Sequence, residues 1–202
     1  MTTVRTRAMG VTTGGAIGVD ELAWFGTTAY ALACVWACKA ASTKPRRDDD
    51  ATRVSERAAR FVSSLRMFAP MCALYGVLLC RSWTPETLSL MMPGSLEEGL
   101  ATGKVQFIPT LSSISTLLGA RATATSAWAH LLCVNVFVAR HVALKTRERF
   151  ERDGRAPPVA HTLALTALAG PLGLLAYALT CFVYDAWSRR VAAAAAEPPV
   201  AR

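Results

Sequence analysis

Long apolar stretches with few charges dominate the hydrophobic pattern of this chain. The four longest are Leu22–Cys38, Phe61–Cys80, Ser126–Leu144 and Val159–Tyr184. A helix of roughly 17–25 mainly apolar residues can cross the hydrocarbon core of a membrane. A helix at the surface of a soluble bundle needs a polar face, whereas Leu22–Cys38 is apolar nearly all round. The pattern therefore predicts an all-α fold, an integral membrane four-helix bundle, with buried helices of a soluble bundle as the alternative.

The connector 81–125 between the second and third stretches is the longest, and it is partly apolar. Its runs Leu88–Met92 and Phe107–Leu118 are each too short to span a membrane, and prolines interrupt the connector. We therefore expect an interfacial or re-entrant segment between helices 2 and 3, and not a fifth span.

The two ends of the chain differ from its apolar middle. Residues 1–19 contain no acidic residue, which is typical of a targeting segment, and we predict an N-terminal tail there. The four-helix membrane domain is predicted over residues 20–184, followed by a flexible C-terminal tail over residues 185–202. The alternative for the first apolar stretch is the core of a signal peptide, although it exceeds the usual ~7–15 residues.

Composition and charge agree with a membrane protein and give it an orientation. Of the 202 residues, 52% are hydrophobic and 18% charged, yet the net charge is +8. Residues 39–60 and 145–155 hold seven and five of the 22 Lys and Arg residues. Four crossings place both segments on one side, in the sense of the positive-inside rule, and both termini on the other. Such a basic balance indicates contact with anionic lipid head groups and no nucleic-acid partner.

The sequence offers no motif for a cofactor or a metal. The six cysteines fall in or at the ends of the apolar stretches, and none forms a Cys-x-x-Cys pair. Phosphate-binding, dinucleotide-binding, zinc-protease and haem motifs are missing as well. We therefore predict no cofactor and no metal, and we expect the cysteines to serve in packing.

Polar side chains at membrane depth are candidates for function, because burying them in lipid is costly. Arg140, His141 and His161 are predicted near the basic face, where ligand binding and contact with lipid head groups are alternatives. Asn135 lies in the middle of the third stretch, where a hydrogen bond between helices is the commoner role. Arg66 lies close enough to an interface for its charge to reach water.

Glu86 and His130 are predicted to lie towards the same membrane face, opposite the basic segments. Thr84 and Pro85 resemble a helix start, and in that reading Glu86 only complements the helix dipole. The alternative is that the carboxylate of Glu86 and the imidazole of His130 act as an acid–base pair.

Gly170-Pro171-Leu172-Gly173 interrupts the fourth stretch near its middle. Pro171 removes a backbone hydrogen bond, and the two glycines allow a helix or a flat ligand to approach closely. Pro70 acts similarly on the second stretch. Two kinked helices predict a groove for a long hydrophobic molecule, and kinks that serve packing alone are the alternative.

Three segments of the chain resemble a plant and algal plastid family with cyanobacterial relatives. The segments are Tyr75–Leu88, Ser126–Arg140 and His161–Leu175. The family is the neoxanthin synthase, or abscisic-acid-deficiency, type. The resemblance implies a small four-helix integral membrane protein of thylakoid or envelope that is required to convert violaxanthin to neoxanthin, and it implies no cofactor. The sequence departs from the family at Asn135, where Asp is usual.

From this resemblance we expect an intramolecular isomerase with an epoxy-carotenoid and membrane lipid as its partners. Opening an epoxide to an allene needs an acid for the oxygen and a base for a ring-adjacent proton, and it involves no net redox change. We expect Glu86 and His130 to be this catalytic pair. The residues expected to contact the substrate are Trp83, Trp128, Asn135, Arg140, His161, Gly170, Pro171 and Gly173.

Two other classes of function stay open at this point. One is a non-catalytic carotenoid-binding or assembly protein that joins photosynthetic membrane complexes. The other is a small membrane scaffold without a ligand. The Asn at position 135, where the family usually has Asp, favours the non-catalytic carotenoid protein over the isomerase that the resemblance alone implies.

Overall fold

The computed structural model describes residues 18–43, 49–85, 87, 101 and 111–196. Every regular element in this part of the chain is helical, which confirms the all-α class. The helices are α1 (Val19–Ser42), α2 (Asp49–Ser63), the 3-10 helix η1 (Leu65–Phe68), α3 (Ala69–Ser82), α6 (Leu111–Gly119), α7 (Arg121–Asp153), α8 (Ala160–Leu168) and α9 (Gly170–Ala196). Residues 1–17 of the predicted tail 1–19 and the run Leu88–Met92 lie outside the described residues, and α1 already begins at Val19.

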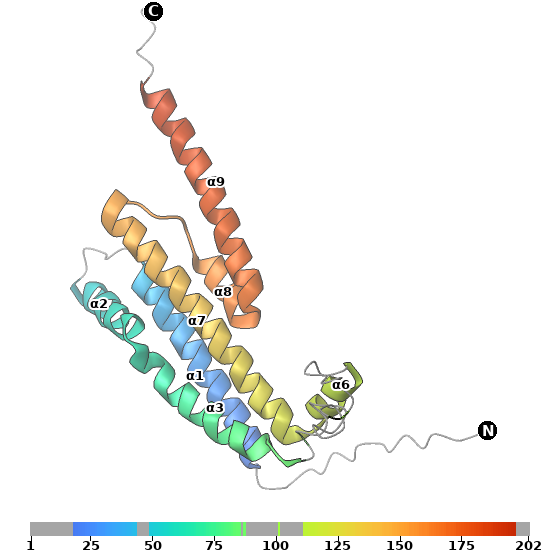
Figure 1. Ribbon diagram of the computed structural model, residues 1–202. Helices are drawn as coiled ribbons and strands as arrows, with labels where there is room; N and C mark the ends of the chain where they lie inside the picture. The colour runs from blue at the N-terminus through green and yellow to red at the C-terminus, as the bar shows by residue number, and fades with distance from the viewer. Residues whose placement is uncertain (1–17, 44–48, 86, 88–100, 102–110, 197–202) are drawn as a thin grey trace, which may run out of the picture.

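Helices α1, α3 and α7 lie side by side and form the central bundle (Figure 1). Arg121 forms an ion pair with Glu21, so the N-terminal ends of α7 and α1 meet and the two helices run parallel. Arg81 at the C-terminal end of α3 lies 3.7 Å from Asp20, so α3 runs antiparallel to both.

Many buried residues of this bundle are small, although Met67, Met71, Leu78, Leu132, Val136 and Val142 are buried as well, and many large apolar side chains are exposed. The buried residues of α1 and α7 include Ala31, Cys34, Ala37, Cys38, Ala41, Ala129, Ala139 and Ala143. The exposed residues of α1 and α7 include Leu22, Phe25, Leu32, Trp36, Leu131 and Phe137, and α9 adds Leu175 and Phe182. Buried threonines satisfy their hydroxyls within their own helices: Thr27, Thr146 and Thr166 each donate to the carbonyl four residues earlier.

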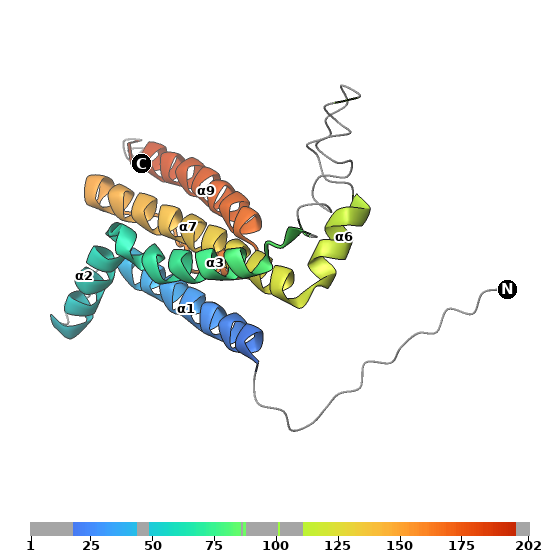
Figure 2. The same ribbon diagram turned by 60° about the horizontal axis from the view of Figure 1, so that its bottom comes forward.

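The second apolar stretch is not one continuous helix. The chain bends by 74° between α2 and the η1–α3 segment, and Figure 2 shows α2 turning away from the line of α3. The bend falls at Ser64, whose Oγ accepts a hydrogen bond from the Arg66 backbone N–H (3.1 Å) and so begins a new helix. Pro70 lies in the first turn of α3, where its missing N–H costs no hydrogen bond. The predicted kink is therefore a helix start.

Part of the predicted basic loop 39–60 is the amphipathic helix α2. Its buried face consists of Ser55, Ala58, Ala59 and Val62, while its arginines are exposed. The second basic segment, 145–155, is likewise helical as far as Asp153, because α7 continues nine residues beyond the predicted end of the third span. The described parts of both segments lie at the end of the molecule where α1 and α7 end (Figure 1).

A helical hairpin replaces the single kinked span predicted over Val159–Tyr184. His161 Nε2 of α8 lies 2.8 Å from Thr180 Oγ1 of α9, and Gly173 packs against Thr166. The pair Thr166–Gly173 lies close to the turn, and the pair His161–Thr180 lies farther from it along both helices. The two helices α8 and α9 are therefore antiparallel. The chain breaks at Ala169, directly before the predicted Gly170–Gly173, and it reverses there instead of bending.

Helix α9 runs parallel to α7 as a result of this reversal. The Gly170 backbone N–H donates to Asn135 Oδ1 (2.8 Å), and fifteen residues later Asp185 pairs with Arg149. The C-terminal end of α9 therefore lies at the same end of the molecule as the C-terminal end of α7 (Figure 1), opposite to the predicted side. The predicted flexible tail from residue 185 is helical as far as Ala196.

Among the described residues, α7 alone is both long and apolar enough to cross a membrane as one helix. The bent pair of α2 with η1–α3 is a second candidate if it forms one span. Helices α1 and α9 have the length, with 24 and 27 residues, but not the mean hydropathy. The structure thus shows the helical class, and the membrane architecture is taken up below as a proposal.

Candidate functional site

A mostly apolar cavity of about 380 Å³ lies where α3, α6 and α7 meet. It contains two of the residues that the sequence predicts for the site, His130 and Trp83. Helix α6 contributes Leu117 and Leu118 to its wall. The described part of the connector between the second and third stretches therefore closes one side of this cavity.

Helix α7 presents one face to the cavity. The lining residues Thr123, Ser126, Ala127, His130 and Leu131 follow each other at spacings of three, one, three and one, which keeps them on one side of a helix. The side chain of His130 is exposed, and its ring centroid lies 5.4 Å from that of Tyr75 on α3. Within the described residues no hydrogen bond uses the imidazole, so both ring nitrogens are available to a ligand.

Helix α3 and the residues after it form the opposite wall. Tyr75, Leu79 and Ser82 share a helix face, and Trp83, which is 52% exposed, follows directly. Thr84 Oγ1 accepts a hydrogen bond from the Thr87 backbone N–H (3.3 Å), which confirms the predicted helix start.

Thr87 anchors this start and also lines the cavity. The hydroxyl of Thr87 donates to the Ser82 backbone carbonyl (2.8 Å), which holds the new turn against the end of α3. Glu86 itself lies outside the described residues. Its neighbour in the chain, Thr87, belongs to the same cavity as His130.

Trp128, Arg140 and His161 do not line this cavity, and each is bound within the fold. The indole N–H of Trp128 donates to Thr28 Oγ1 (2.9 Å). Its ring stacks on Trp24 at 5.8 Å, so Trp128 joins α7 to α1. His161 joins α8 to α9.

Arg140 caps the end of α2. Its Nε donates to the Val62 carbonyl (2.8 Å) and its Nη2 to the Ser63 carbonyl (2.9 Å). These carbonyls have no partner within their own helix, so a cation there satisfies them and complements the helix dipole. The geometry gives Arg140 a structural task that residue spacing alone does not reveal.

Asn135 of α7 lies against the turn of the α8–α9 hairpin, and Gly170, Pro171 and Gly173 belong to the first turn of α9 that follows it. A Cβ atom on Gly170 would lie 2.7 Å from Asn135 Oδ1, and one on Gly173 would lie 2.7 Å from the Thr166 Cα. The two glycines therefore serve the close approach of helices, which is one of the two roles that the sequence suggests for them. None of the four lines the cavity with His130.

Sequence reasoning missed Tyr75, Thr123 and Ser126 as cavity residues. Tyr75 lies at the start of the first segment that resembles the family, and Ser126 at the start of the second. Thr123 and Ser126 precede His130 by seven and four residues, the spacing of one helix face. The helical periodicity around His130 could therefore have predicted Thr123 and Ser126 as residues of the α7 wall.

The described residues contain no group of three His, Cys, Asp or Glu side chains that could hold a metal ion. The polar side chains of the cavity are one indole, one imidazole and hydroxyls, from Trp83, His130, Tyr75, Ser82, Thr87, Thr123 and Ser126. The hydroxyls of Ser82 and Thr87 already donate to backbone carbonyls. Such a set can bind an oxygen-bearing apolar molecule and exchange a proton with it through the imidazole.

Known proteins match the middle part of this chain. A family model described as ABA DEFICIENT 4-like matches residues 23–177, which include the cavity and the hairpin turn. The protein named Protein ABA DEFICIENT 4, chloroplastic, from Arabidopsis thaliana is 33% identical over 109 residues. The match covers 53% of this chain and 41% of that relative, so the chain spans less than half of the relative's length. No solved structure matches this chain.

Proposed function

Because this chain belongs to the ABA DEFICIENT 4-like family, we propose that it is a membrane protein of xanthophyll biosynthesis that isomerises an epoxy-carotenoid. The reaction is of the violaxanthin-to-neoxanthin type, in which an epoxide opens to an allene. The observation that carries the proposal is the apolar cavity in which His130 faces Tyr75 and Trp83. The relative's printed name supports a plastid location.

The proposed setting is a membrane crossed by α1, by η1 with α3, and by α7. At 1.5 Å per residue these segments measure about 36, 27 and 50 Å, against a hydrocarbon core of about 30 Å. Large apolar side chains on the outside and small ones inside are the arrangement expected in lipid, where close approach of helices drives association. The same surface in water would expose an extensive apolar patch.

The α8–α9 hairpin fits this setting as a re-entrant element. Helix α8 has nine residues and measures about 13 Å, roughly half the thickness of the core. Irregular backbone at that depth needs protein partners for its polar groups. Asn135 Oδ1 accepts from Gly170 N–H, and the Ala169 N–H donates to the Leu165 carbonyl (2.8 Å), so the turn has such partners. We therefore propose three spans and a re-entrant hairpin in place of four spans.

The proposed chemistry transfers one proton to oxygen and removes one from carbon. An acid protonates the epoxide oxygen, the carbon–oxygen bond breaks, and a base takes the proton from the adjacent carbon of the polyene. His130 is the proposed base or acid, because an imidazole can both accept and donate a proton and no described residue forms a hydrogen bond with this one. Glu86 is the proposed partner, since the cavity includes Thr87, the next residue in the chain.

The cavity lies at a suitable depth for the end ring of a carotenoid. His130 lies about 14 Å along α7 from Arg121, in the half of the membrane at the N-terminal end of α7. A xanthophyll has about the length of the membrane's thickness, so its ring lies in this half when its chain spans the core. Trp83 and Tyr75 then flank the ring while hydroxyls bind its oxygen.

The departure from the family at Asn135 does not by itself oppose catalysis in this chain. The side chain of Asn135 is buried, and its one described hydrogen bond accepts the Gly170 N–H. Both Asn and Asp present an oxygen for this bond, so the exchange removes a charge and keeps the acceptor. Asn135 lies outside the cavity and binds the hairpin turn, so its role is structural.

Expression of the full chain in a host that accumulates violaxanthin tests the proposal. We expect neoxanthin, or another allenic product, in the pigment extract. Absence of any product, while the Arabidopsis relative makes neoxanthin in the same host, would contradict an isomerase. Co-purification of unconverted carotenoid with the protein would then favour the non-catalytic binding role.

A further inference from the structure

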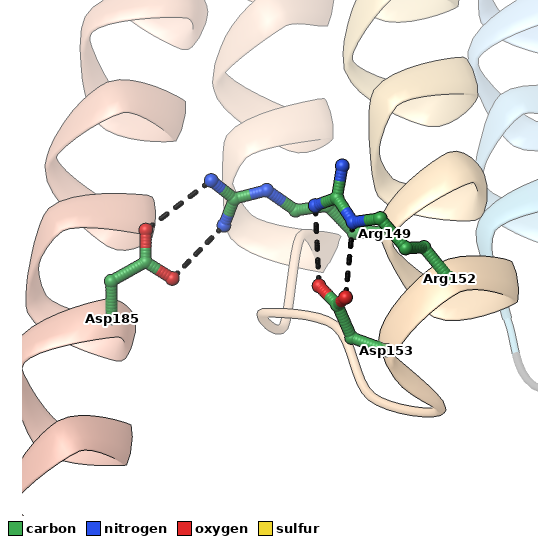
Figure 3. Close-up of polar contacts among 4 residues, drawn as sticks. All are labelled: Arg149, Arg152, Asp153 and Asp185. Atoms are coloured by element: carbon green, nitrogen blue, oxygen red, sulfur yellow. Dashed lines mark hydrogen bonds and ion pairs between the residues drawn. The ribbon is translucent and has the colours of Figure 1, made fainter.

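A second, polar cavity lies at the other end of α7, between that helix and α9. It measures about 600 Å³ and includes Arg149, Asp153, Arg155, Asp185 and Arg189. We call it the arginine cleft. Arg149 spans the two helices and donates from both terminal nitrogens to the carboxylate of Asp185, each at 3.2 Å (Figure 3).

The two carboxylates of the arginine cleft are already occupied. Asp185 is bound by Arg149, and Asp153 accepts two hydrogen bonds from Arg152 at 3.0 and 3.2 Å (Figure 3). The bonds from Arg152 also lower the pKa of Asp153, so this carboxylate carries its charge at neutral pH. Arg155 and Arg189 have no ion-pair partner within 4 Å among the described residues and leave the cleft with uncompensated positive charge.

Ser188 supplies an independent sign of a ligand in this cleft. It lines the cavity, is only 8% exposed, and its hydroxyl has no hydrogen-bond partner in the described part of the chain. A buried hydroxyl without a partner destabilises a fold, and a ligand oxygen would satisfy it.

An apolar groove of about 390 Å³ adjoins the arginine cleft along α9. Leu179, Val183 and Trp187 form it, with Pro158 from the loop before α8. Tyr184 lines both cavities, so the cleft and the groove lie next to each other on α9. A polar, positively charged cavity beside an apolar groove matches a molecule with an anionic head and an apolar chain.

We propose that the arginine cleft and its groove bind one anionic glycerolipid. The anionic group of the head accepts hydrogen bonds from Arg155, Arg189 and the Ser188 hydroxyl, and one acyl chain lies in the groove. Arginine suits this task because its planar fork donates two parallel hydrogen bonds to a phosphate-type oxyanion. The proposal rests on the membrane setting proposed above and not on the pigment reaction, which takes place at the other end of α7.

Binding of phosphatidylglycerol to the purified full chain in detergent tests the head-group site. Native mass spectrometry would count bound lipids, with phosphatidylcholine of the same acyl chains as the neutral comparison. We expect phosphatidylglycerol to be preferred, and Arg155→Gln with Arg189→Gln to weaken its binding roughly 25-fold, about fivefold for each arginine. Arg57→Gln with Arg190→Gln removes the same charge from exposed positions outside the cleft and serves as the matched control.

Equal binding of the two lipids, or an equal loss in the control variant, would overturn the proposal. A Ser188→Ala variant keeps the cleft arginines, and we expect it to fold and to bind phosphatidylglycerol several-fold more weakly. An unchanged affinity in Ser188→Ala together with an unchanged affinity in the arginine variant would equally reject the site.

Inorganic phosphate distinguishes a lipid from a free anion. We expect millimolar phosphate to leave the bound lipid in place, and Trp187→Ala, which removes part of the groove, to weaken phosphatidylglycerol binding about tenfold. Displacement of the lipid by phosphate, with no effect of Trp187→Ala, would show a simple anion site and overturn the lipid assignment. Pigment conversion is measured separately, so failure of either proposal leaves the other testable.

Discussion

The two ends of α7 carry opposite kinds of cavity on one continuous helix. At its N-terminal half, the cavity around His130 is mostly apolar and contains a single imidazole among hydroxyls. At its C-terminal end, the arginine cleft contains five charged side chains. The helix has 33 residues and measures about 50 Å, so only part of it fits a hydrocarbon core of about 30 Å. In the proposed membrane setting, depth along α7 would separate the proposed proton chemistry on an apolar substrate from the proposed binding of an anionic head group.

Replacement of His130 by Gln should have the largest effect. It should lower pigment conversion at the N-terminal half of α7 and leave the C-terminal end of α7 unaffected. Loss of a positioned acid or base lowers a rate by about 10²–10⁴-fold, so we expect conversion to fall at least a hundredfold. Lipid binding at the arginine cleft should be unchanged. Pigment analysis and native mass spectrometry on the same preparation measure both.

His141→Gln is the matched control for His130→Gln, since it is an exposed histidine on the same helix outside the cavity. Conversion should stay at the level of the unmodified chain in this variant. Full conversion in His130→Gln would remove the imidazole from the mechanism and leave the cavity as a binding site only.

Replacement of Asn135 by Leu should have the next largest effect. It should lower the stability of the contact between α7 and the α8–α9 hairpin. The change leaves the buried Gly170 N–H without a partner, which costs about 1–3 kcal/mol of unfolding free energy. Asn135→Asp keeps an oxygen acceptor and should retain both the fold and pigment conversion. Thermal unfolding in detergent compares the two variants, and equal loss of stability in both would contradict the proposed role of the oxygen.

Replacement of Asp185 by Asn should have the smallest effect on stability. The Arg149–Asp185 pair is partly exposed, and such pairs contribute about 0.2–1 kcal/mol, less at high salt. Asp153→Asn is the comparison, because Asp153 pairs with its neighbour Arg152 and joins no second helix. A loss above 2 kcal/mol in Asp185→Asn would show that the charged end holds α9 in place and does not only bind a ligand.

The sequence predicts the positions of the helices better than the path of the chain between them. Apolar stretches predict where helices form, because burial in lipid or in a core needs consecutive apolar residues. They do not predict whether Pro171 bends the chain or reverses it. That outcome depends on Asn135, which accepts the Gly170 N–H from 35 residues away, and on the contact of Gly173 with Thr166.

The candidate site was likewise predictable only in part. His130 and Trp83 are expected together from the sequence, and they line one cavity. Arg140 and Trp128 have polar or aromatic groups that suit a ligand, but in the structure their partners are the end of α2 and the ring of Trp24. Residue type and depth in a membrane cannot distinguish a partner within the fold from a ligand, because both satisfy the same donors.

The reversal at Gly170 also decides what must be translocated during membrane insertion. A fourth span would carry Arg189 and Arg190 through the hydrocarbon core to the opposite compartment, at a cost of roughly 2.5–3.5 kcal/mol for each charge. A hairpin that enters and returns leaves both arginines in the compartment where α7 ends. A reporter fused after α9 should therefore be found in the same compartment as one inserted between α7 and α8, and on the opposite side from one placed before α1.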